Sequence, residues 1–198
     1  MKKYGIIGGT FDPIHFAHLY IADEAKYSLG LDKVIFMPNG NPPHKALKEV
    51  SEGFLRYEMV CEGIKGLDGF IASDYEIKRD EPSFTYKTLQ AFKEKDVELF
   101  FITGADCLMD LEEWENIKEI FNNANLVVFK RPGFTFEDLK EQKKYIEEKY
   151  ETKIIFLNLK DLDISSTDIR KRIKENRNVK FFLPNGVLDI IKREKLYK

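Results

Sequence analysis

The sequence is poor in cysteine and has no long apolar run. Its 198 residues include only two cysteines, Cys61 and Cys107, too few for the disulfide framework of a small secreted protein. No segment approaches the roughly 18 consecutive apolar residues of a membrane span. Met1-Lys2-Lys3 runs directly into the first apolar segment, without the pattern of a signal peptide. We therefore expect a cytoplasmic protein with reduced thiols and no membrane partner.

A dominant charge is missing as well. The 32 lysines and arginines nearly balance the 34 acidic residues, which gives a net charge of −2. Without a basic excess, nucleic acid is not an expected partner, and local basic residues would serve a small anion. A hydrophobic content of 43% suffices for one buried core. We expect a single domain over residues 1–198.

Several common site motifs are also absent. No G-x-x-x-x-G-K-[ST] occurs, which excludes a P-loop. No G-x-G-x-x-G occurs either, and the second apolar strand ends in Met37-Pro38-Asn39 instead of an acidic residue for a ribose. A dinucleotide-binding oxidoreductase is therefore disfavoured. The three histidines lack the H-E-x-x-H spacing of zinc proteases, which disfavours zinc.

Strand and helix patterns alternate along the whole chain, which is typical of an α/β fold. Strands are expected at 4–7, 34–37, 70–72, 99–102, 126–129 and 154–157, with a further extended piece at 75–79. The pattern predicts a single Rossmann-like, doubly wound parallel sheet with C-terminal helices.

The expected helices lie between these strands. The first would begin near Asp12-Pro13, with aspartate as the cap and proline at the first helical position, and would end before Gly30. Others cover 55–66, 89–92 and a highly charged, solvated stretch at 137–153. The last two would begin at Ser166-Thr167 and at Pro184.

Residues 8–18, Gly-Gly-Thr-Phe-Asp-Pro-Ile-His-Phe-Ala-His, are the most informative stretch. Gly8-Gly9 follow an apolar strand, where backbone without side chains lets a ligand approach closely. His15 and His18 would share one face near a helix N-terminus, where amides and the helix dipole favour an anion. The stretch predicts a phosphate-binding site.

With the motifs that follow it, this stretch resembles the H-x-G-H nucleotidyltransferase superfamily, and in detail the bacterial nicotinate mononucleotide adenylyltransferases. The likeness covers nearly the whole chain, in the order of the family. It includes Pro42-Pro43-His44-Lys45, Pro82-Ser83-Phe84-Thr85, Gly104-Ala105-Asp106, Trp114, Lys130-Arg131-Pro132-Gly133 and Ile164-Ser165-Ser166-Thr167-Asp168-Ile169-Arg170. The resemblance implies adenylyl transfer from ATP to nicotinate mononucleotide in NAD biosynthesis. Since ligands of open parallel sheets bind beyond the carboxyl ends of the strands, one crevice is expected to hold both substrates.

The resemblance also implies roles for residues on the ATP side. His15, His18 and Arg170 would be catalytic, with the imidazoles at the α-phosphate and the guanidinium at the leaving pyrophosphate. The other implied ATP-binding residues are Gly8, Gly9, Thr10, Phe11, Ser165, Ser166 and Thr167. Mg²⁺ is expected as a bridge between phosphates, held mainly by ligand oxygens and water, with no protein ligand named.

A second set is implied for nicotinate mononucleotide. Trp114 would stack on the nicotinate ring, Asp106 would bind a ribose, and amides near Thr85 would hold the carboxylate. Lys45 and His44 would hold the phosphate, and Arg131 would neutralise nearby charge.

Three positions depart from the family pattern. Ala17 stands where glycine is usual and would place a methyl group close to the nucleotide, Phe84 replaces tyrosine, and Lys87 replaces aspartate. The alternatives are the related nicotinamide mononucleotide and phosphopantetheine adenylyltransferases, a cytidylyltransferase, and a nucleotide-binding sensor without turnover. A sensor has no need for His15, His18 and Arg170 together. The sequence leaves a homo-oligomer open.

Overall fold

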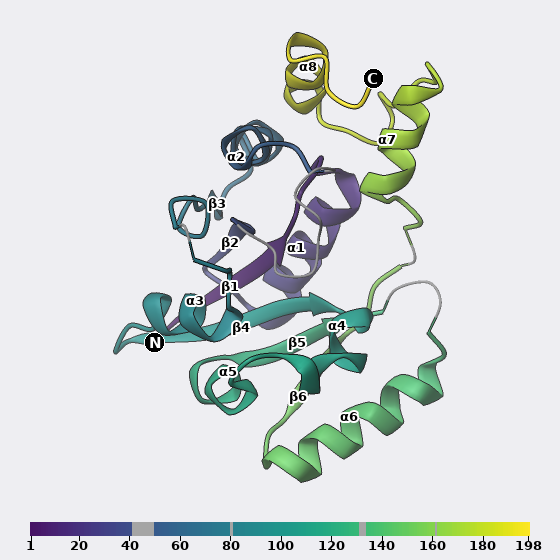
Figure 1. The fold of residues 1–198 in the computed structure, drawn as a ribbon. Helices are drawn as coiled ribbons and strands as arrows, with labels where there is room; N and C mark the ends of the chain where they lie inside the picture. The colour runs from purple at the N-terminus through teal and green to yellow at the C-terminus, as the bar shows by residue number, and fades with distance from the viewer. Residues whose placement is uncertain (41–49, 80, 131–133, 161) are drawn as a thin grey trace. The chain divides into compact units, whose positions relative to one another are not determined.

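The computed structural model describes residues 1–40, 50–79, 81–130, 134–160 and 162–198 (Figure 1). Its six strands form one sheet in the order β3-β2-β1-β4-β5-β6. The strands are β1 (Lys2–Gly9), β2 (Lys33–Pro38), β3 (Phe70–Ala72), β4 (Val97–Gly104), β5 (Asn125–Phe129) and β6 (Ile154–Leu157). This is the strand order of the doubly wound nucleotide-binding sheet, and it confirms the predicted α/β, Rossmann-like class.

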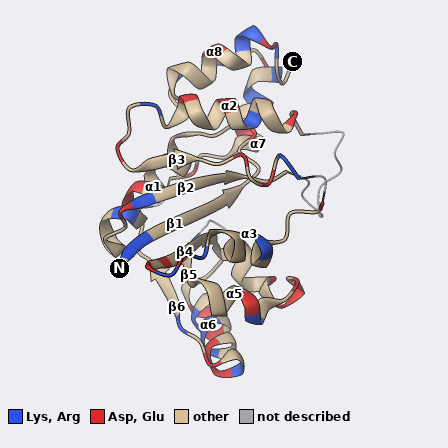
Figure 2. Ribbon diagram, turned by 90° about the vertical axis from the view of Figure 1, so that its left-hand side faces the viewer, with Lys and Arg blue, Asp and Glu red and all other residues tan. Residues whose placement is uncertain are grey.

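Helices connect the strands. They are α1 (Phe16–Leu29), α2 (Gly53–Gly63), α3 (Thr85–Phe92), α4 (Ala105–Met109), α5 (Ile117–Asn123), α6 (Phe136–Tyr150), α7 (Ser166–Lys174) and α8 (Asn185–Arg193). A short 3-10 helix, Leu111–Glu113, follows α4. Charged residues of both signs gather on helices and loops, whereas the strands are mostly uncharged (Figure 2). Within the described residues, no helix combines the length and the apolar character needed to cross a membrane.

Several expected boundaries are wrong. Helix α1 begins at Phe16 instead of near Asp12-Pro13, because the His15 carbonyl accepts the first helical bonds, from the amides of His18 and Leu19. Pro184 is the residue before α8 and not its first helical residue. Helices α4 and α5 were not expected, and Cys107 lies within α4.

The extended piece expected at 75–79 is a turn. The amide of Lys78 donates to the carbonyl of Asp74, and the amide of Arg79 donates to that of Glu76. These short-range bonds satisfy the backbone locally, so the segment has no need of a neighbouring strand.

The chain divides into two compact units, each assembled from several segments. The first unit comprises Met1–Gly8, Asp23–Val34 and Phe84–Asp161, and the second comprises Gly9–Ala22, Ile35–Ser83 and Leu162–Lys198. The single domain expected from the sequence stays a prediction.

Four parallel strands form the core of the first unit. Ile6 pairs with Phe101, Phe101 with Leu126, and Leu126 with Ile154. Ile6, Leu126 and Ile154 are at most 2% exposed. Strands buried on both faces carry continuous apolar runs, which explains why β4 and β5 were evident in the sequence. Each such side chain contributes about 1.5–3 kcal/mol by burial.

The second unit has a core of its own, in which α2 packs against α8. A methyl group added at Gly63 of α2 would lie 3.0 Å from Ile14 Cγ2 and 3.5 Å from Val187 Cγ2. Ile14 and Val187 are fully buried. The segment between β1 and α1 is therefore anchored in this core through Ile14.

Candidate active site

The loop from Thr10 to His15, called here the β1–α1 loop, turns back over the end of β1. Phe11 has a φ of 51° and is 2% exposed. Its ring packs on the backbone of Gly9, where an added Cβ would come within 3.0 Å of the ring. A side chain at position 9 would therefore force the buried Phe11 ring to shift by a few tenths of an ångström.

His15 and His18 lie side by side at the start of α1. Their rings stack with centroids 3.7 Å apart, as expected for two residues sharing one side of the helix start. The edge of the Phe11 ring contacts His18 at a centroid distance of 5.0 Å. His15 is 4% exposed and His18 is half-buried. His18 is therefore held between two rings.

One hydrogen bond determines the tautomer of neutral His18. The backbone amide of His15 donates to His18 Nδ1 over 3.3 Å. A ring nitrogen that accepts a hydrogen bond carries no proton, so the proton of neutral His18 is on Nε2. His18 thus presents an N–H donor at Nε2.

The first turn of α7 is bonded to the β1–α1 loop. The cap expected at Ser166-Thr167 lies one residue earlier, because Ser165 accepts from the Asp168 amide at 3.1 Å and the helix begins at Ser166. The Ser166 hydroxyl donates to the Pro13 carbonyl at 2.9 Å. Arg170 donates from Nη1 to the Asp12 carbonyl at 2.8 Å and from Nη2 to Thr167 Oγ1 at 3.4 Å. The second unit therefore brings together the residues assigned to ATP from Gly9 to Arg170, while Gly8 ends a segment of the first unit.

Arg56 of α2 is a residue of this group that sequence reasoning missed. It is 2% exposed and donates to three backbone carbonyls, of Thr10 at 2.8 Å, Asn39 at 2.7 Å and Ser51 at 2.9 Å. Burial lowers the pKa of its guanidinium, while the nearby Asp12 acts in the opposite direction. A buried charge needs such partners, so the three bonds both stabilise Arg56 and join three chain segments.

The Asp12 carboxylate does not cap α1. Its Oδ2 accepts from the Ser51 amide at 3.2 Å, and its Oδ1 accepts from the Tyr197 hydroxyl. The carboxylate is thus committed to partners distant in the sequence, which is why α1 begins later than the local pattern indicated.

Three of the residues assigned to nicotinate mononucleotide lie in the first unit. Asp106 is in the first turn of α4, directly after β4, and Trp114 follows the 3-10 helix. The Trp114 ring is half-buried and meets the Phe101 ring of β4 edge-on, with centroids 6.0 Å apart. Thr85 is the first residue of α3, so backbone amides beside it belong to the first turn of that helix.

Two of the three departures from the family pattern contact each other. The Lys87 ammonium lies over the Phe84 ring, 5.6 Å from its centroid. A cation over an aromatic face is attracted by the ring quadrupole. Ala17 is 5% exposed, so its methyl group is covered by protein, and the expectation that it crowds the nucleotide finds no support.

Known proteins resemble the chain over its whole length. A model of the cytidylyltransferase-like family matches residues 6–172. A Clostridium botulinum protein named probable nicotinate-nucleotide adenylyltransferase is 59% identical over 198 residues, which cover 100% of this chain and 99% of the relative. This chain belongs to the family of nicotinate-nucleotide adenylyltransferases. A relative of the same name from Clostridium perfringens strain 13 is 54% identical over 200 residues, which cover 100% of this chain and 99% of that relative.

Solved structures share the fold. The Plasmodium falciparum nicotinic acid mononucleotide adenylyltransferase complexed with NaAD superposes with a TM-score of 0.80 at 20% identity, covering 100% of this chain and 98% of that one. The same enzyme complexed with APC gives a TM-score of 0.77 at 20% identity over the same shares.

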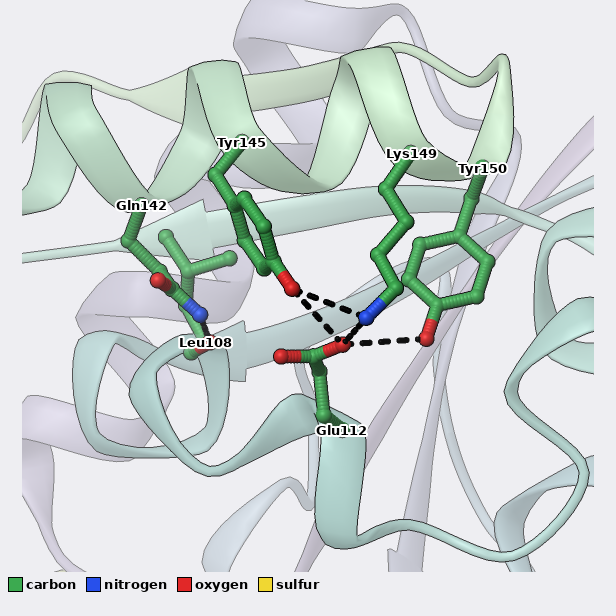
Figure 3. Close-up of polar contacts among 6 residues, drawn as sticks. All are labelled: Leu108, Glu112, Gln142, Tyr145, Lys149 and Tyr150. Carbon is green, nitrogen blue, oxygen red and sulfur yellow. Dashed lines mark hydrogen bonds and ion pairs between the residues drawn. The ribbon is translucent and has the colours of Figure 1, made fainter.

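Helix α6 supports the segment that carries Trp114 (Figure 3). Glu112 of the 3-10 helix accepts hydrogen bonds at Oε1 from Lys149, Tyr150 and Tyr145. Gln142 donates to the Leu108 carbonyl at 3.3 Å. The bond from Lys149 lowers the pKa of Glu112, and the bond to Glu112 raises the pKa of Lys149. We call Glu112, Tyr145, Lys149 and Tyr150 the α6 cluster. The charged helix expected at 137–153 therefore has one face with a structural role.

The structure does not describe every site residue that the sequence predicts. His44, Lys45 and Arg131 lie outside the described residues. Over the part of the chain that is described, no group of three or more His, Cys, Asp or Glu side chains is arranged to hold a metal ion.

Proposed function

We propose that this chain transfers the adenylyl group of ATP to nicotinate mononucleotide, giving nicotinate adenine dinucleotide and pyrophosphate in NAD biosynthesis. The observation that carries the proposal is the stacked His15–His18 pair, which presents an Nε2 donor beside a loop bonded to the first turn of α7. Relatives more than half identical over their whole length bear this activity in their names.

The reaction needs positioning and charge stabilisation more than a protein nucleophile. A phosphate oxygen of the mononucleotide, already an anion at neutral pH, attacks the α-phosphorus of ATP in line. The new P–O bond forms as the bond from the α-phosphorus to the bridging oxygen breaks, and pyrophosphate leaves with that electron pair. We assign His18 Nε2 as the donor to the α-phosphate, where negative charge accumulates.

The neighbouring residues have supporting roles in this proposal. His15 is buried against His18 and orients its ring. The Phe11 side chain is buried, so its part in ATP binding is limited to its backbone. Gly8, Gly9 and Thr10 offer backbone and hydroxyl groups to the phosphates, and the α7 turn with Arg170 receives the leaving pyrophosphate.

Mg²⁺ belongs to this proposal as a companion of ATP. Its ligands at such sites are mostly phosphate oxygens and water, so we assign it no side chain. When bound, it supplies neutralisation of phosphate charge. The cytoplasmic location stays a prediction, and a homo-oligomer stays open.

On the mononucleotide side, we propose Trp114 as the platform for the nicotinate ring, Asp106 for a ribose and the amides near Thr85 for the carboxylate. The roles of His44, Lys45 and Arg131 rest on the resemblance alone.

A panel of acceptors tests the proposal. Pyrophosphate release is measured with ATP and, in turn, nicotinate mononucleotide, nicotinamide mononucleotide and phosphopantetheine, and with CTP in place of ATP. Nicotinate mononucleotide with ATP is expected to give the highest kcat/KM. Turnover of phosphopantetheine alone would move the chain to a sister activity. ATP binding without any turnover would favour a sensor.

His18→Ala is the variant that tests the site. We expect kcat to fall at least about a hundredfold, because one preorganised donor to a transition-state oxygen is worth roughly 10² to 10³. His18→Gln keeps an N–H donor and is expected to retain more activity than His18→Ala. Circular dichroism and thermal unfolding serve as folding controls. Turnover of His18→Ala close to the unsubstituted rate would contradict the assignment.

A further inference from the structure

The segment after α8 folds back toward the β1–α1 loop. Lys195 and Tyr197 have φ values of 53° and 62°, and the Leu196 amide donates to the Ile191 carbonyl at 3.0 Å. This reversal brings the half-buried Tyr197 hydroxyl to Asp12, which accepts a hydrogen bond from it, and to Ser51, whose hydroxyl donates to it over 3.4 Å. Met59 Sδ lies 4.0 Å from the same oxygen.

Asp12 is held at both its side chain and its backbone. The carboxylate is 2% exposed and accepts from the Tyr197 hydroxyl and from the Ser51 amide. The carbonyl of the same residue accepts from Arg170, the guanidinium that we assign to the pyrophosphate. A shift of the Asp12 side chain would therefore move the carbonyl that orients Arg170.

The loop needs external support to keep its shape. Phe11, directly before Asp12, is a bulky residue with a φ of 51°, a region that costs about 1–3 kcal/mol and persists only where the surroundings enforce it. Arg56 restrains the loop at Thr10, Ser166 at Pro13 and Arg170 at the Asp12 carbonyl. Tyr197 and Ser51 restrain the remaining group, the Asp12 carboxylate.

Burial and the neighbouring charges keep the Tyr197 hydroxyl protonated, so that it can donate a hydrogen bond. Burial, followed by the Asp12 carboxylate, raises the pKa of Tyr197 above its ordinary value of 10.0, while the hydrogen bond from Ser51 and the charge of Arg170 act the other way. Besides Asp12, Arg56 is the other buried charged side chain among these residues. The hydroxyl thus stays neutral at physiological pH and can donate to Asp12.

We propose that Tyr197 is a positioning residue for adenylyl transfer: through its hydrogen bond to Asp12 it fixes the peptide on which Arg170 is oriented, without touching the nucleotide itself. The proposal rests on the proposed function. It assigns a role in the reaction to a residue 185 positions away from Asp12, outside every motif that carries the family resemblance.

The test uses Tyr197→Phe in the full chain, since this variant keeps the ring and removes only the hydroxyl. We expect kcat to fall about tenfold, because small misplacement of a catalytic group is costly. The KM for nicotinate mononucleotide should change less than about twofold, since Thr85, Asp106 and Trp114, which we assign to it, lie in the other unit. Tyr27→Phe is the matched control, because Tyr27 is 88% exposed, and its kinetics should equal those of the unsubstituted chain.

Two further measurements separate positioning from a general loss of stability. First, all rates are taken well below the midpoint of thermal unfolding, where a purely stabilising residue leaves kcat unchanged. Second, Asp12→Ala, which removes the acceptor of the Tyr197 hydroxyl, is combined with Tyr197→Phe. If Tyr197 acts through Asp12, the double variant should be no slower than Asp12→Ala alone, whereas independent roles would multiply the two losses.

An unchanged kcat in Tyr197→Phe, with or without a lower unfolding midpoint, would overturn the proposal, and so would multiplied losses in the double variant. Equilibrium binding gives a readout besides turnover, in which Tyr197→Phe should weaken ATP more than AMP. If the unsubstituted chain shows no adenylyl transfer, the proposed function fails. In that case the binding ratio still decides whether Tyr197 orients the pyrophosphate end of the site.

Discussion

Under the proposed function, Arg170 would have two tasks that only a guanidinium can combine. One of its nitrogens is bonded to the Asp12 carbonyl and another to Thr167. Its planar fork has five N–H donors, so it can keep these bonds and also contact a phosphate, whereas a lysine ammonium is a compact point charge. The β1–α1 loop and the leaving group would therefore be coupled through a single side chain.

We expect Arg170→Ala to weaken ATP binding by at least about tenfold and to leave AMP binding nearly unchanged, because only ATP carries the pyrophosphate group. Arg170→Lys should also be impaired. Isothermal titration of each nucleotide measures the ratio. Arg172→Ala is the control from the same helix, since Arg172 pairs with Asp168 and lies over the Phe182 ring. Equal losses for ATP and AMP would restrict Arg170 to holding the loop.

The raised pKa of Tyr197 makes its contribution to stability dependent on pH. The hydroxyl ionises more easily in the unfolded chain, so its stabilising effect is complete below the ordinary pKa of 10.0 and declines as the pH rises above it. At pH 7 we expect Tyr197→Phe to lower the free energy of unfolding by about 1–2 kcal/mol. Urea unfolding at pH 7 and near pH 10.5 should show this difference shrinking, and a difference that is the same at both pH values would refute the argument.

At the level of elements, the segment from α4 to Trp114 has little regular structure of its own. It comprises a five-residue helix and a three-residue 3-10 helix. Its support comes from α6, through Glu112 with Lys149 and two tyrosines, and through Gln142 (Figure 3). Exposed ion pairs contribute little to overall stability. We infer that the α6 cluster acts mainly on the placement of Trp114.

Lys149→Ala tests this inference. The KM for nicotinate mononucleotide should rise about threefold, the size of effect expected from a partly exposed network, while the KM for ATP stays the same. Trp114 is the only tryptophan of the chain, so its fluorescence reports the local change directly. Lys144→Ala is the control, because Lys144 pairs with Glu148 on the same helix and is 77% exposed. An unchanged emission spectrum and KM in Lys149→Ala would contradict the inference.

Elements defined by their own residues could be predicted from the sequence. Strands β4 and β5 appear as apolar runs because both of their faces are buried. The start of α7 was recognisable from its serine and threonine run, although the cap is Ser165 and not the expected Ser166-Thr167. The start of α1 was not predictable, because the Asp12 side chain is bonded to Ser51 and Tyr197, which are 39 and 185 positions away.

Gly40 is another position that only the folded structure explains. A methyl group there would lie 2.0 Å from the Glu76 carbonyl oxygen, and the Gly40 amide donates to the Ser83 hydroxyl at 3.1 Å. The residue follows β2, and its Asn39-Gly40 pair indicates a turn but not this contact. Its requirement for glycine arises from a chain segment 36 positions further on, which no local pattern can indicate.

For the molecule as a whole, the parts of the candidate site that lie in contiguous motifs could be predicted from the sequence. The residues that support them from distant segments could not. The β1–α1 loop and the α7 turn each occupy one short stretch and were recognised. The hydrogen bonds of Arg56 reach three chain segments, which no single motif contains. One signal could have been used, because Arg56 lies one turn before Met59 and Val60, on the buried face of α2. Tyr197 gave no such signal.

The division into two units has a functional consequence. The residues assigned to ATP from Gly9 onward belong to the second unit, and Thr85, Asp106 and Trp114 belong to the first. Substitutions at these residues should therefore change the kinetic constants of one substrate and spare those of the other. Trp114→Ala is expected to raise the KM for nicotinate mononucleotide and leave the KM for ATP unchanged.

Selectivity between acid and amide follows from the same assignment. If backbone amides near Thr85 receive the nicotinate carboxylate, an amide substrate brings an NH₂ donor toward donors and leaves them unpaired. We expect nicotinate mononucleotide to exceed the amide in kcat/KM by about ten- to a hundredfold, less than the largest known discriminations, because Phe84 and Lys87 replace the usual residues. Steady-state kinetics with both mononucleotides measures the ratio. Trp114→Ala should weaken both and preserve their ratio, since stacking does not distinguish acid from amide. Equal efficiency on the two substrates would refute the acid-specific assignment and point to an enzyme that accepts either.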